Sequence, residues 1–218
     1  MASKESDYNI LKKVAEEESY DFDKLINLWT VESSRGTDPN WDKGDYIGHF
    51  QFGTLAAKDV GFNLSDAYDL EKSARAAIKL SKKNTKDMPN SSRILKSLGI
   101  DNDGDEKGLI DYIAHQQGRA GMLDIISTTE SGKFGSASTR SNILDNLGLS
   151  DIQKKEMDII GPPTVQDNKN LAKNYLNFWK ARYKDKKANA KQWKKSQAKN
   201  NDTSFFFPDE NVMNEALG

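Results

Sequence analysis

Apolar residues recur at the three- and four-residue spacing of an α-helix along almost the whole chain, and no segment alternates polar and apolar residues as a strand would. Nine phenylalanines, seven tyrosines and four tryptophans, within a 36% apolar composition, suffice for a folded core. The sequence therefore predicts a mainly α fold without internal repeats. We expect helices over residues 8–18, 22–32, 54–60, 69 or 73 to 80, 91–98, 109–117, 122–126, 143–147, 152–159 and 168–187.

Capping and breaking residues set the ends of several of these helices. Asp21 is a good N-cap for the second helix, and Asp69 or Ser73 would open a later one. Gly61 and Gly118 would each end a helix.

Residues 33–53 separate two helical segments and are rich in Gly, Asp and Ser. They contain the turn signal Asp38-Pro39-Asn40. We therefore expect a loop here, which could include a short hairpin over residues 44–52.

The charge and apolar patterns divide the chain into a main domain over residues 1–199 and a tail over residues 200–218. The domain ends in a long basic helix, and the tail contains Phe205-Phe206-Phe207-Pro208 between polar residues. This apolar segment could attach the protein to a partner or pack as a strap onto its own domain. The basic helix could neutralise phosphates, with Trp179, Tyr183 and Trp193 as stacking groups. A solvated lysine face over a core stripe is the favoured interpretation, so a nucleic-acid partner is not expected.

Composition excludes several kinds of chemistry. The chain has no cysteine, so disulfides, thiol catalysis and cysteine-based zinc sites are impossible, and its two histidines stand far apart. We expect no cofactor. The N-terminal residues lack the apolar core of a signal peptide and no stretch is long enough for a membrane span, so we expect synthesis in the cytoplasm without a signal peptide.

An acidic segment, Asp101-Asn102-Asp103-Gly104-Asp105, resembles the start of a calcium loop in which alternate carboxylates converge on one cation. Position six of such a loop is Glu106 rather than glycine, and position twelve is Tyr112 rather than glutamate. Asp101, Asp103 and Asp105 are therefore only a weak calcium site. A solvated turn that caps the following helix is the better interpretation.

Glu32 is the strongest catalytic candidate. It ends an apolar helical run and shares a helix face with Leu28 and Trp29. Its carboxyl group therefore projects from the apolar face of the helix that packs into the core. Desolvation would raise its pKa and let it carry a proton near neutral pH, as a general acid must. The alternative is a solvated glutamate at a helix end.

Three segments together resemble the lytic transglycosylase and goose-type lysozyme superfamily, which cleaves peptidoglycan. They are Glu32-Ser33, Gly48-His49-Phe50-Gln51-Phe52 and Ala114-His115-Gln116-Gln117-Gly118. In that family the motifs run Glu-Ser, Gly-Leu-Met-Gln and Ala-Tyr-Asn-Ala-Gly, in the same order and at similar spacing. The form Ala-His-Gln-Gln-Gly is similar to the third motif of a phage and prophage branch. The resemblance covers roughly residues 22–126 and implies a lysozyme-like helical domain with a small loop or hairpin beside the catalytic glutamate.

The resemblance implies roles for individual residues. Glu32 falls on the single catalytic acid, Ser33 on the serine beside it, and Gln51 on the glutamine that binds the glycan. Phe50 replaces a methionine and would supply an apolar wall. The other substrate-binding candidates are Tyr112, His115, Gln116 and Tyr175; His115 and Gln116 replace the family's tyrosine and asparagine, and the late motif Glu-Thr-x-x-Tyr keeps only its end at Tyr175.

The implied function is cleavage of the β-1,4 bond between N-acetylmuramic acid and N-acetylglucosamine by a lytic transglycosylase. A muramidase-type hydrolase such as an endolysin, with Asp38, Asp42 or Asp45 holding a water, is one alternative. A non-catalytic structural virion protein with the same fold is another. Because the third motif is phage-like and no signal peptide is apparent, we expect a protein carried in a phage tail or ejection apparatus that acts on the cell wall. Its expected partners are glycan strands and other virion proteins.

Overall fold

The computed structural model describes residues 6–39, 41, 44–86, 95–101, 107–147 and 165–203. The predicted mainly α fold is confirmed. Within the described residues, the only strand-like pairing is a single antiparallel bridge between Ile47 and Phe52, inside the predicted hairpin. The elements are α1 (Asp7–Glu17), α2 (Phe22–Ser33), α3 (Thr54–Val60), the 3-10 turn η1 (Leu64–Asp66), α4 (Leu70–Thr85), α6 (Leu109–Ser131), α7 (Ala137–Asn146) and α9 (Val165–Thr203).

Local capping explains where the early helices begin and end. The Asp21 side chain accepts a hydrogen bond from the Lys24 amide at the start of α2, and Asp69 does the same for Lys72 at the start of α4. The helix α3 has the predicted bounds and ends at Gly61, which has a left-handed backbone. Both predicted N-caps, Asp21 and Asp69, are therefore confirmed.

The later helices are longer than predicted. The helix α6 continues through the predicted stop at Gly118, where φ of 65° and ψ of 170° produce a kink. The helix α7 begins earlier than residue 143 because Ser136 caps it. The helix α9 extends to Thr203 instead of 187, and Trp193 in the added part packs on Trp29 with ring centroids 5.5 Å apart. Residues 91–94 and 152–159 lie outside the described residues, as does the tail from residue 204.

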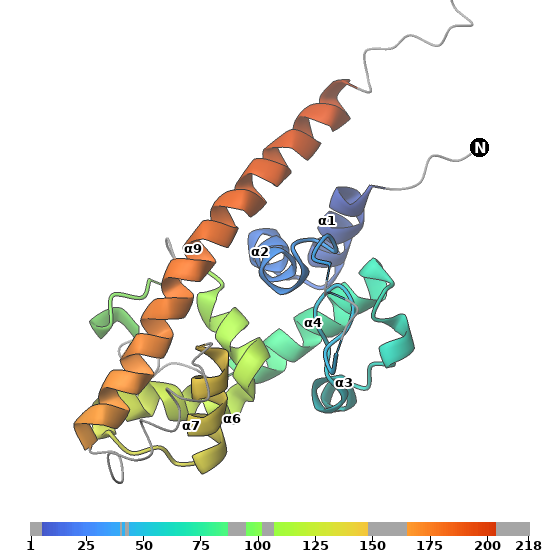
Figure 1. Ribbon diagram of the computed structural model, residues 1–218. Helices are drawn as coiled ribbons and strands as arrows, with labels where there is room; N and C mark the ends of the chain where they lie inside the picture. Colours follow the sequence, from blue (N-terminus) through green and yellow to red (C-terminus); the bar gives the residue numbers. More distant parts are fainter. Residues whose placement is uncertain are drawn as a thin grey trace, which may run out of the picture.

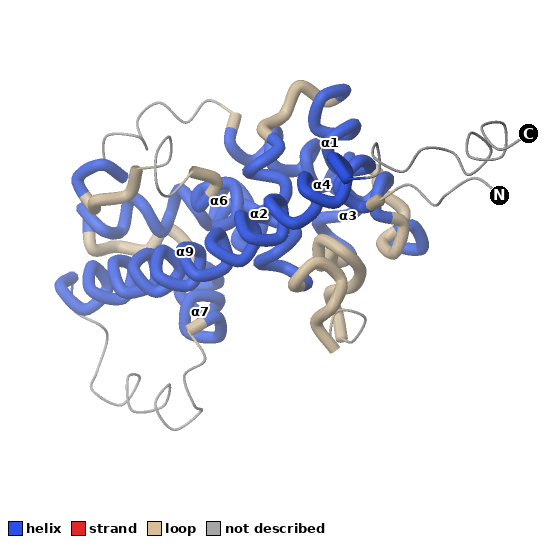
Figure 2. The backbone as a smooth tube through the Cα atoms, turned by 90° about the horizontal axis from the view of Figure 1, so that it is seen from above, coloured by secondary structure: helices blue, strands red, loops and turns tan. Residues whose placement is uncertain are grey.

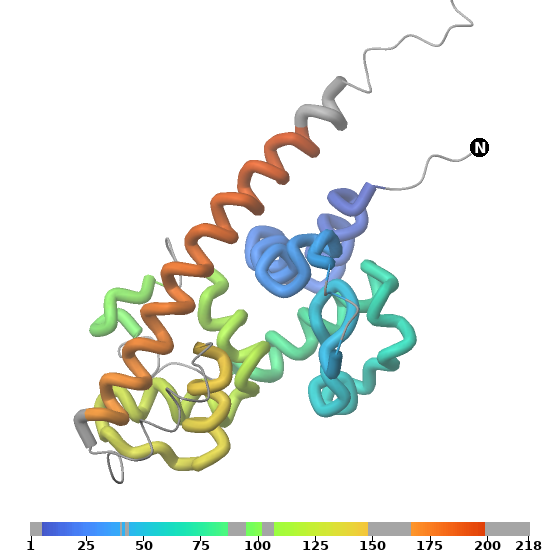
Figure 3. Tube along the Cα trace, in the orientation of Figure 1, coloured from blue at the N-terminus to red at the C-terminus, as the bar shows by residue number. Residues whose placement is uncertain are grey.

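The long helix α9 joins two groups of helices. Figure 1 shows α1 to α4 on one side and α6 with α7 on the other, with α9 crossing both groups. The helix packs against α6, α2 and α7, and the view from above in Figure 2 shows the same course. Figure 3 shows the blue helix α2 beside α9, in agreement with the packing of these two helices. One continuous core of buried residues runs through both groups.

A buried network around Asp111 fixes the first turn of α6. One carboxylate oxygen accepts hydrogen bonds from the hydroxyls of Tyr20, at 3.0 Å, and Ser81, at 2.6 Å. The other accepts from the Lys24 ammonium group at 2.8 Å. The network ties α6 to α2, to α4 and to the segment before α2. It therefore sets the position of the residues that follow Asp111 on α6.

No helix among the described residues is both long and apolar enough to cross a membrane.

Candidate active site

Glu32 lies in the last turn of α2, with its side chain only 10% exposed. Its Oε1 atom is buried and has no hydrogen-bond partner among the described residues. Burial raises the pKa of Glu32 to about 8. The carboxyl group is therefore mostly protonated at neutral pH and can donate a proton.

His115 of α6 is the polar group facing Glu32. Its Nε2 lies 4.0 Å from Glu32 Oε1 and 2.8 Å from the carbonyl oxygen of Phe50. Because a carbonyl only accepts, we assign the proton to Nε2, which leaves Nδ1 as a buried acceptor with no partner in the described part of the chain. Burial lowers the pKa of His115 below its usual value, so the ring is neutral. Glu32 and His115 are therefore two neutral groups rather than an ion pair.

Two tyrosine hydroxyls and two glutamine side chains form a hydrogen-bonded cluster near Glu32. Gln116 Nε2 donates to the Tyr112 hydroxyl at 2.5 Å, and Gln117 Nε2 donates to the Tyr175 hydroxyl at 2.9 Å. The Tyr175 hydroxyl in turn donates to Gln116 Oε1 at 3.3 Å. Burial, and to a smaller extent the charge that Glu32 carries when ionised, raises the pKa of both tyrosines. Both hydroxyls therefore stay protonated.

The structure thus brings together residues from distant parts of the chain. Glu32 comes from α2, Tyr112 and His115 from α6 before its kink, and Tyr175 from α9. Tyr175 is held in place by a row of buried aromatic residues, in which Trp179 and Tyr183 both pack on the ring of Tyr112. Trp179 and Tyr183 are thus core residues and are not available to stack on nucleic-acid bases.

The side chains of Ser33 and Phe50, two of the predicted substrate-binding residues, are fully buried. The Ser33 hydroxyl is fully buried, donating to the His49 carbonyl at 2.8 Å and accepting from the Gly36 amide at 2.9 Å. The Phe50 side chain is also fully buried, and its carbonyl oxygen is the atom that contacts His115. These contacts anchor the loop after α2 to the site, and direct contact of either residue with substrate stays a prediction.

The Gln51 side chain forms hydrogen bonds within the loop that follows α2. It has a left-handed backbone, with φ of 49°. Its side-chain amide donates to the carbonyl oxygens of Trp41, at 2.6 Å, and Gly48, at 2.9 Å. Its role as a glycan ligand also stays a prediction.

Two residues of the site went unrecognised in the sequence. Gln117 binds the Tyr175 hydroxyl, although only its position next to Gln116 in the motif pointed to it. His49 accepts a hydrogen bond from Trp29 Nε1 at 3.2 Å and packs against Trp41, which fastens the loop to α2. Both contacts join residues far apart in sequence, so no local pattern reveals them.

No group of three or more described His, Cys, Asp or Glu residues could hold a metal ion. In the calcium candidate only Asp101 belongs to the described residues, while Asp103 and Asp105 lie outside them. Comparisons with family models, with curated proteins and with solved structures find no match to this chain. The case for a function therefore depends on the geometry around Glu32 and on the motif resemblance.

Proposed function

We propose that the protein is a peptidoglycan lytic transglycosylase with a lysozyme-like helical domain, in which Glu32 is the catalytic acid. The observation that carries this proposal is a buried carboxyl group with a pKa of about 8, whose Oε1 has no hydrogen-bond partner among the described residues. Such a group weakens the fold, because a buried polar atom without a partner costs free energy. A perturbed pKa of this kind is typical of catalytic residues.

In the proposed reaction Glu32 protonates the oxygen between N-acetylmuramic acid and N-acetylglucosamine. The resulting carboxylate then takes the proton of the muramic acid C6 hydroxyl as that oxygen attacks the anomeric carbon. The C1–oxygen bond to the leaving sugar breaks and a 1,6-anhydro end forms, so no water is consumed. Because the nucleophile belongs to the substrate, proximity replaces a second catalytic residue.

The described surroundings of Glu32 support this chemistry over a two-carboxylate hydrolase. Burial is the only cause of the raised pKa of Glu32, so no ionised group among the described residues acts strongly on it. Asp45 in the following loop is exposed, and Asp42 lies outside the described residues. Ordinary glycosidases use a pair of carboxyl groups that flank the bond.

The neighbours of Glu32 offer complementary hydrogen-bonding groups. His115 Nδ1 would accept a hydrogen bond from a sugar hydroxyl, and the hydroxyls of Tyr112 and Tyr175 with the Gln116 amide would form the polar edge of the site. These roles follow the positions that the motif resemblance implies.

The test is mass spectrometry of the soluble products after purified sacculi are incubated with wild-type protein, with Glu32→Gln and with Glu130→Gln. Glu130 is an exposed glutamate of α6 and serves as the matched control. We expect anhydro-muropeptides from the wild type and the control, and a loss of roughly 10²- to 10⁴-fold in Glu32→Gln. Reducing-end products would indicate a hydrolase, and the absence of products from the wild type would refute cleavage.

The phage-like third motif supports a further part of the proposal, that the protein is carried in a tail or ejection apparatus. The tail over residues 200–218 would attach it to another virion protein. Deleting residues 204–218 is expected to reduce its incorporation into particles without lowering its activity on sacculi. Unchanged incorporation would refute this attachment.

A further inference from the structure

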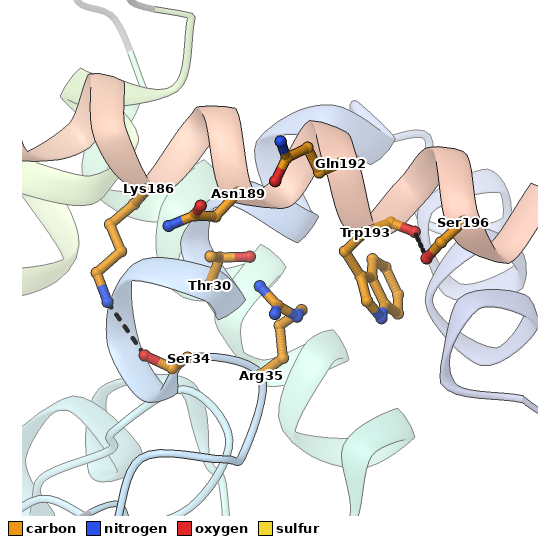
Figure 4. A pocket seen from close by; sticks show the side chains of 8 residues that line it. All are labelled: Thr30, Ser34, Arg35, Lys186, Asn189, Gln192, Trp193 and Ser196. Carbon is orange, nitrogen blue, oxygen red and sulfur yellow. Dashed lines mark hydrogen bonds between the residues drawn. The ribbon is translucent and has the colours of Figure 1, made fainter.

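A concave site lies in the angle between α2 and α9, on the opposite side of α2 from Glu32. It encloses about 410 Å³, within the size range of small-ligand sites. Figure 4 shows its walls, which come from the end of α2 and from successive turns of α9. The lining residues are Thr30, Ser34, Arg35, Lys186, Asn189, Gln192, Trp193 and Ser196.

The site is positively charged. Arg35 and Lys186 line it, no carboxylate does, and neither cation forms an ion pair with a described residue. Lys186 Nζ donates to the Ser34 hydroxyl at 3.1 Å, and the Arg35 guanidinium lies 5.8 Å from the centre of the Trp193 ring. Both cationic side chains are therefore positioned by contacts in the wall of the pocket, and no carboxylate of the lining neutralises their charge.

The backbone of Arg35 is strained. Ser34, Arg35 and Gly36 have consecutive φ values of 49°, 64° and 72°, in the left-handed region that side chains other than glycine rarely adopt. The turn is held by hydrogen bonds from the Ser34 amide to the Thr30 carbonyl and from the Arg35 amide to the Trp29 carbonyl. It keeps Arg35 in the wall of the pocket.

The remaining side chains indicate which anion fits. A guanidinium fork and an ammonium group match an oxyanion, either carboxylate or phosphate. Asn189 and Gln192 offer carbonyl acceptors as well as amide donors. A phosphate ion presents mainly acceptors and would leave those carbonyls unused, whereas a peptide presents N–H donors beside its carboxylates. The lining therefore favours a short acidic peptide.

The site lies close to Glu32. Thr30 lies two residues before Glu32 in α2, which at 100° per residue places it on the far side of that helical turn, and Ser34 follows α2 as its C-cap. The pocket and Glu32 therefore lie on different faces of the end of α2, about one helix diameter, roughly 10 Å, apart. A peptide linked to a glycan at Glu32 would reach the pocket by passing around this end of the helix.

We propose that this pocket binds the carboxylate-bearing stem peptide of peptidoglycan through Arg35 and Lys186. The choice of stem peptide rests on the proposed function, whereas the acidic-peptide chemistry rests on the pocket itself. Arg35 and Lys186 hold the carboxylates, and Asn189 and Gln192 pair with peptide amides. The pocket would then select peptide-bearing muramic acid units for cleavage.

The test is calorimetric titration of the full chain with a synthetic stem tetrapeptide, alanyl-isoglutamyl-diaminopimelyl-alanine. We expect binding by the wild type and at least a tenfold weaker affinity in Arg35→Gln and in Lys186→Gln. Lys191→Gln, which removes the same charge from an exposed position of α9 outside the pocket, should stay within twofold of the wild type. Circular dichroism checks that each variant folds.

Three results would overturn the proposal. They are no binding of the tetrapeptide by the wild type, an affinity of Arg35→Gln and Lys186→Gln equal to that of the wild type, and binding of inorganic phosphate as tight as that of the peptide. Glu32→Gln should bind the tetrapeptide like the wild type. Because this assay involves no glycan and no turnover, a failure here is distinct from a failure of the sacculus assay.

Discussion

Two carboxyl groups of this protein are withdrawn from water, and their surroundings differ sharply. Asp111 accepts hydrogen bonds from Tyr20, Ser81 and Lys24, with its side chain 6% exposed. Glu32 is nearly as buried, yet its Oε1 has no partner among the described residues. The first carboxylate connects helices and stabilises the fold. The second weakens the fold, as is expected where a proton is used in chemistry.

The largest expected effect concerns the pH dependence of stability. Because the folded pKa of Glu32 is about 8, against about 4.5 in the unfolded chain, the folded state binds more protons between these values. This group's contribution to the free energy of unfolding therefore falls as pH rises from about 4.5 to 8, by at most about 5 kcal/mol. Glu32→Gln should be more stable than the wild type at pH 8 and similar at pH 4. Urea denaturation at both pH values measures the difference in free energy of unfolding between Glu32→Gln and the wild type. The same difference at pH 4 and pH 8 would contradict the prediction.

The second largest effect is expected when the carboxylate of Asp111, which has three hydrogen-bond partners, is removed. Asp111→Ala leaves the Lys24 ammonium group and two hydroxyls without their acceptor, so we expect a loss of about 3 kcal/mol in the free energy of unfolding. Asp59→Ala is the matched control, because Asp59 pairs with Lys83 on the surface and is 57% exposed. It should cost less than about 1 kcal/mol. Equal losses in the two variants would show that the Asp111 network does not stabilise the fold.

The smallest effect removes a single donor. Ser81→Ala takes one of the three hydrogen bonds from Asp111 while Tyr20 and Lys24 remain, so we expect a loss of about 1 kcal/mol. Chemical denaturation at pH 7 gives the value. A loss as large as that of Asp111→Ala would mean that the network fails as a unit.

Features of the fold that depend on neighbouring residues could be predicted from the sequence. The helix α3 has the predicted bounds, and Asp21 caps α2 as expected, because both depend on side chains within four residues. The full length of α9 could not be predicted, since its last turns are polar and are held by the contact of Trp193 with Trp29. Gly118 marked a real break in helical geometry but not an end, because the chain resumes the helix after the kink.

The candidate site shows the same limit. The motif resemblance pointed to Glu32, His115 and Tyr175, and the structure places the three near one another. It did not reveal that Ser33 is fully buried or that Gln117 holds the Tyr175 hydroxyl. The Gln117–Tyr175 hydrogen bond links residues 58 positions apart, so it depends on the packing of α6 and α9 rather than on local sequence.

The course of α9 has a consequence for when the candidate site is completed during synthesis. Tyr175 completes the polar edge of the site and Trp193 packs on Trp29, yet both belong to α9, the last of the described helices in chain order. A nascent chain that lacks α9 would expose the apolar faces of α2 and α6 that α9 covers, and its candidate site would lack the Tyr175 hydroxyl. The hydrogen-bonded cluster beside Glu32 is therefore complete only when the chain has been made through Tyr175.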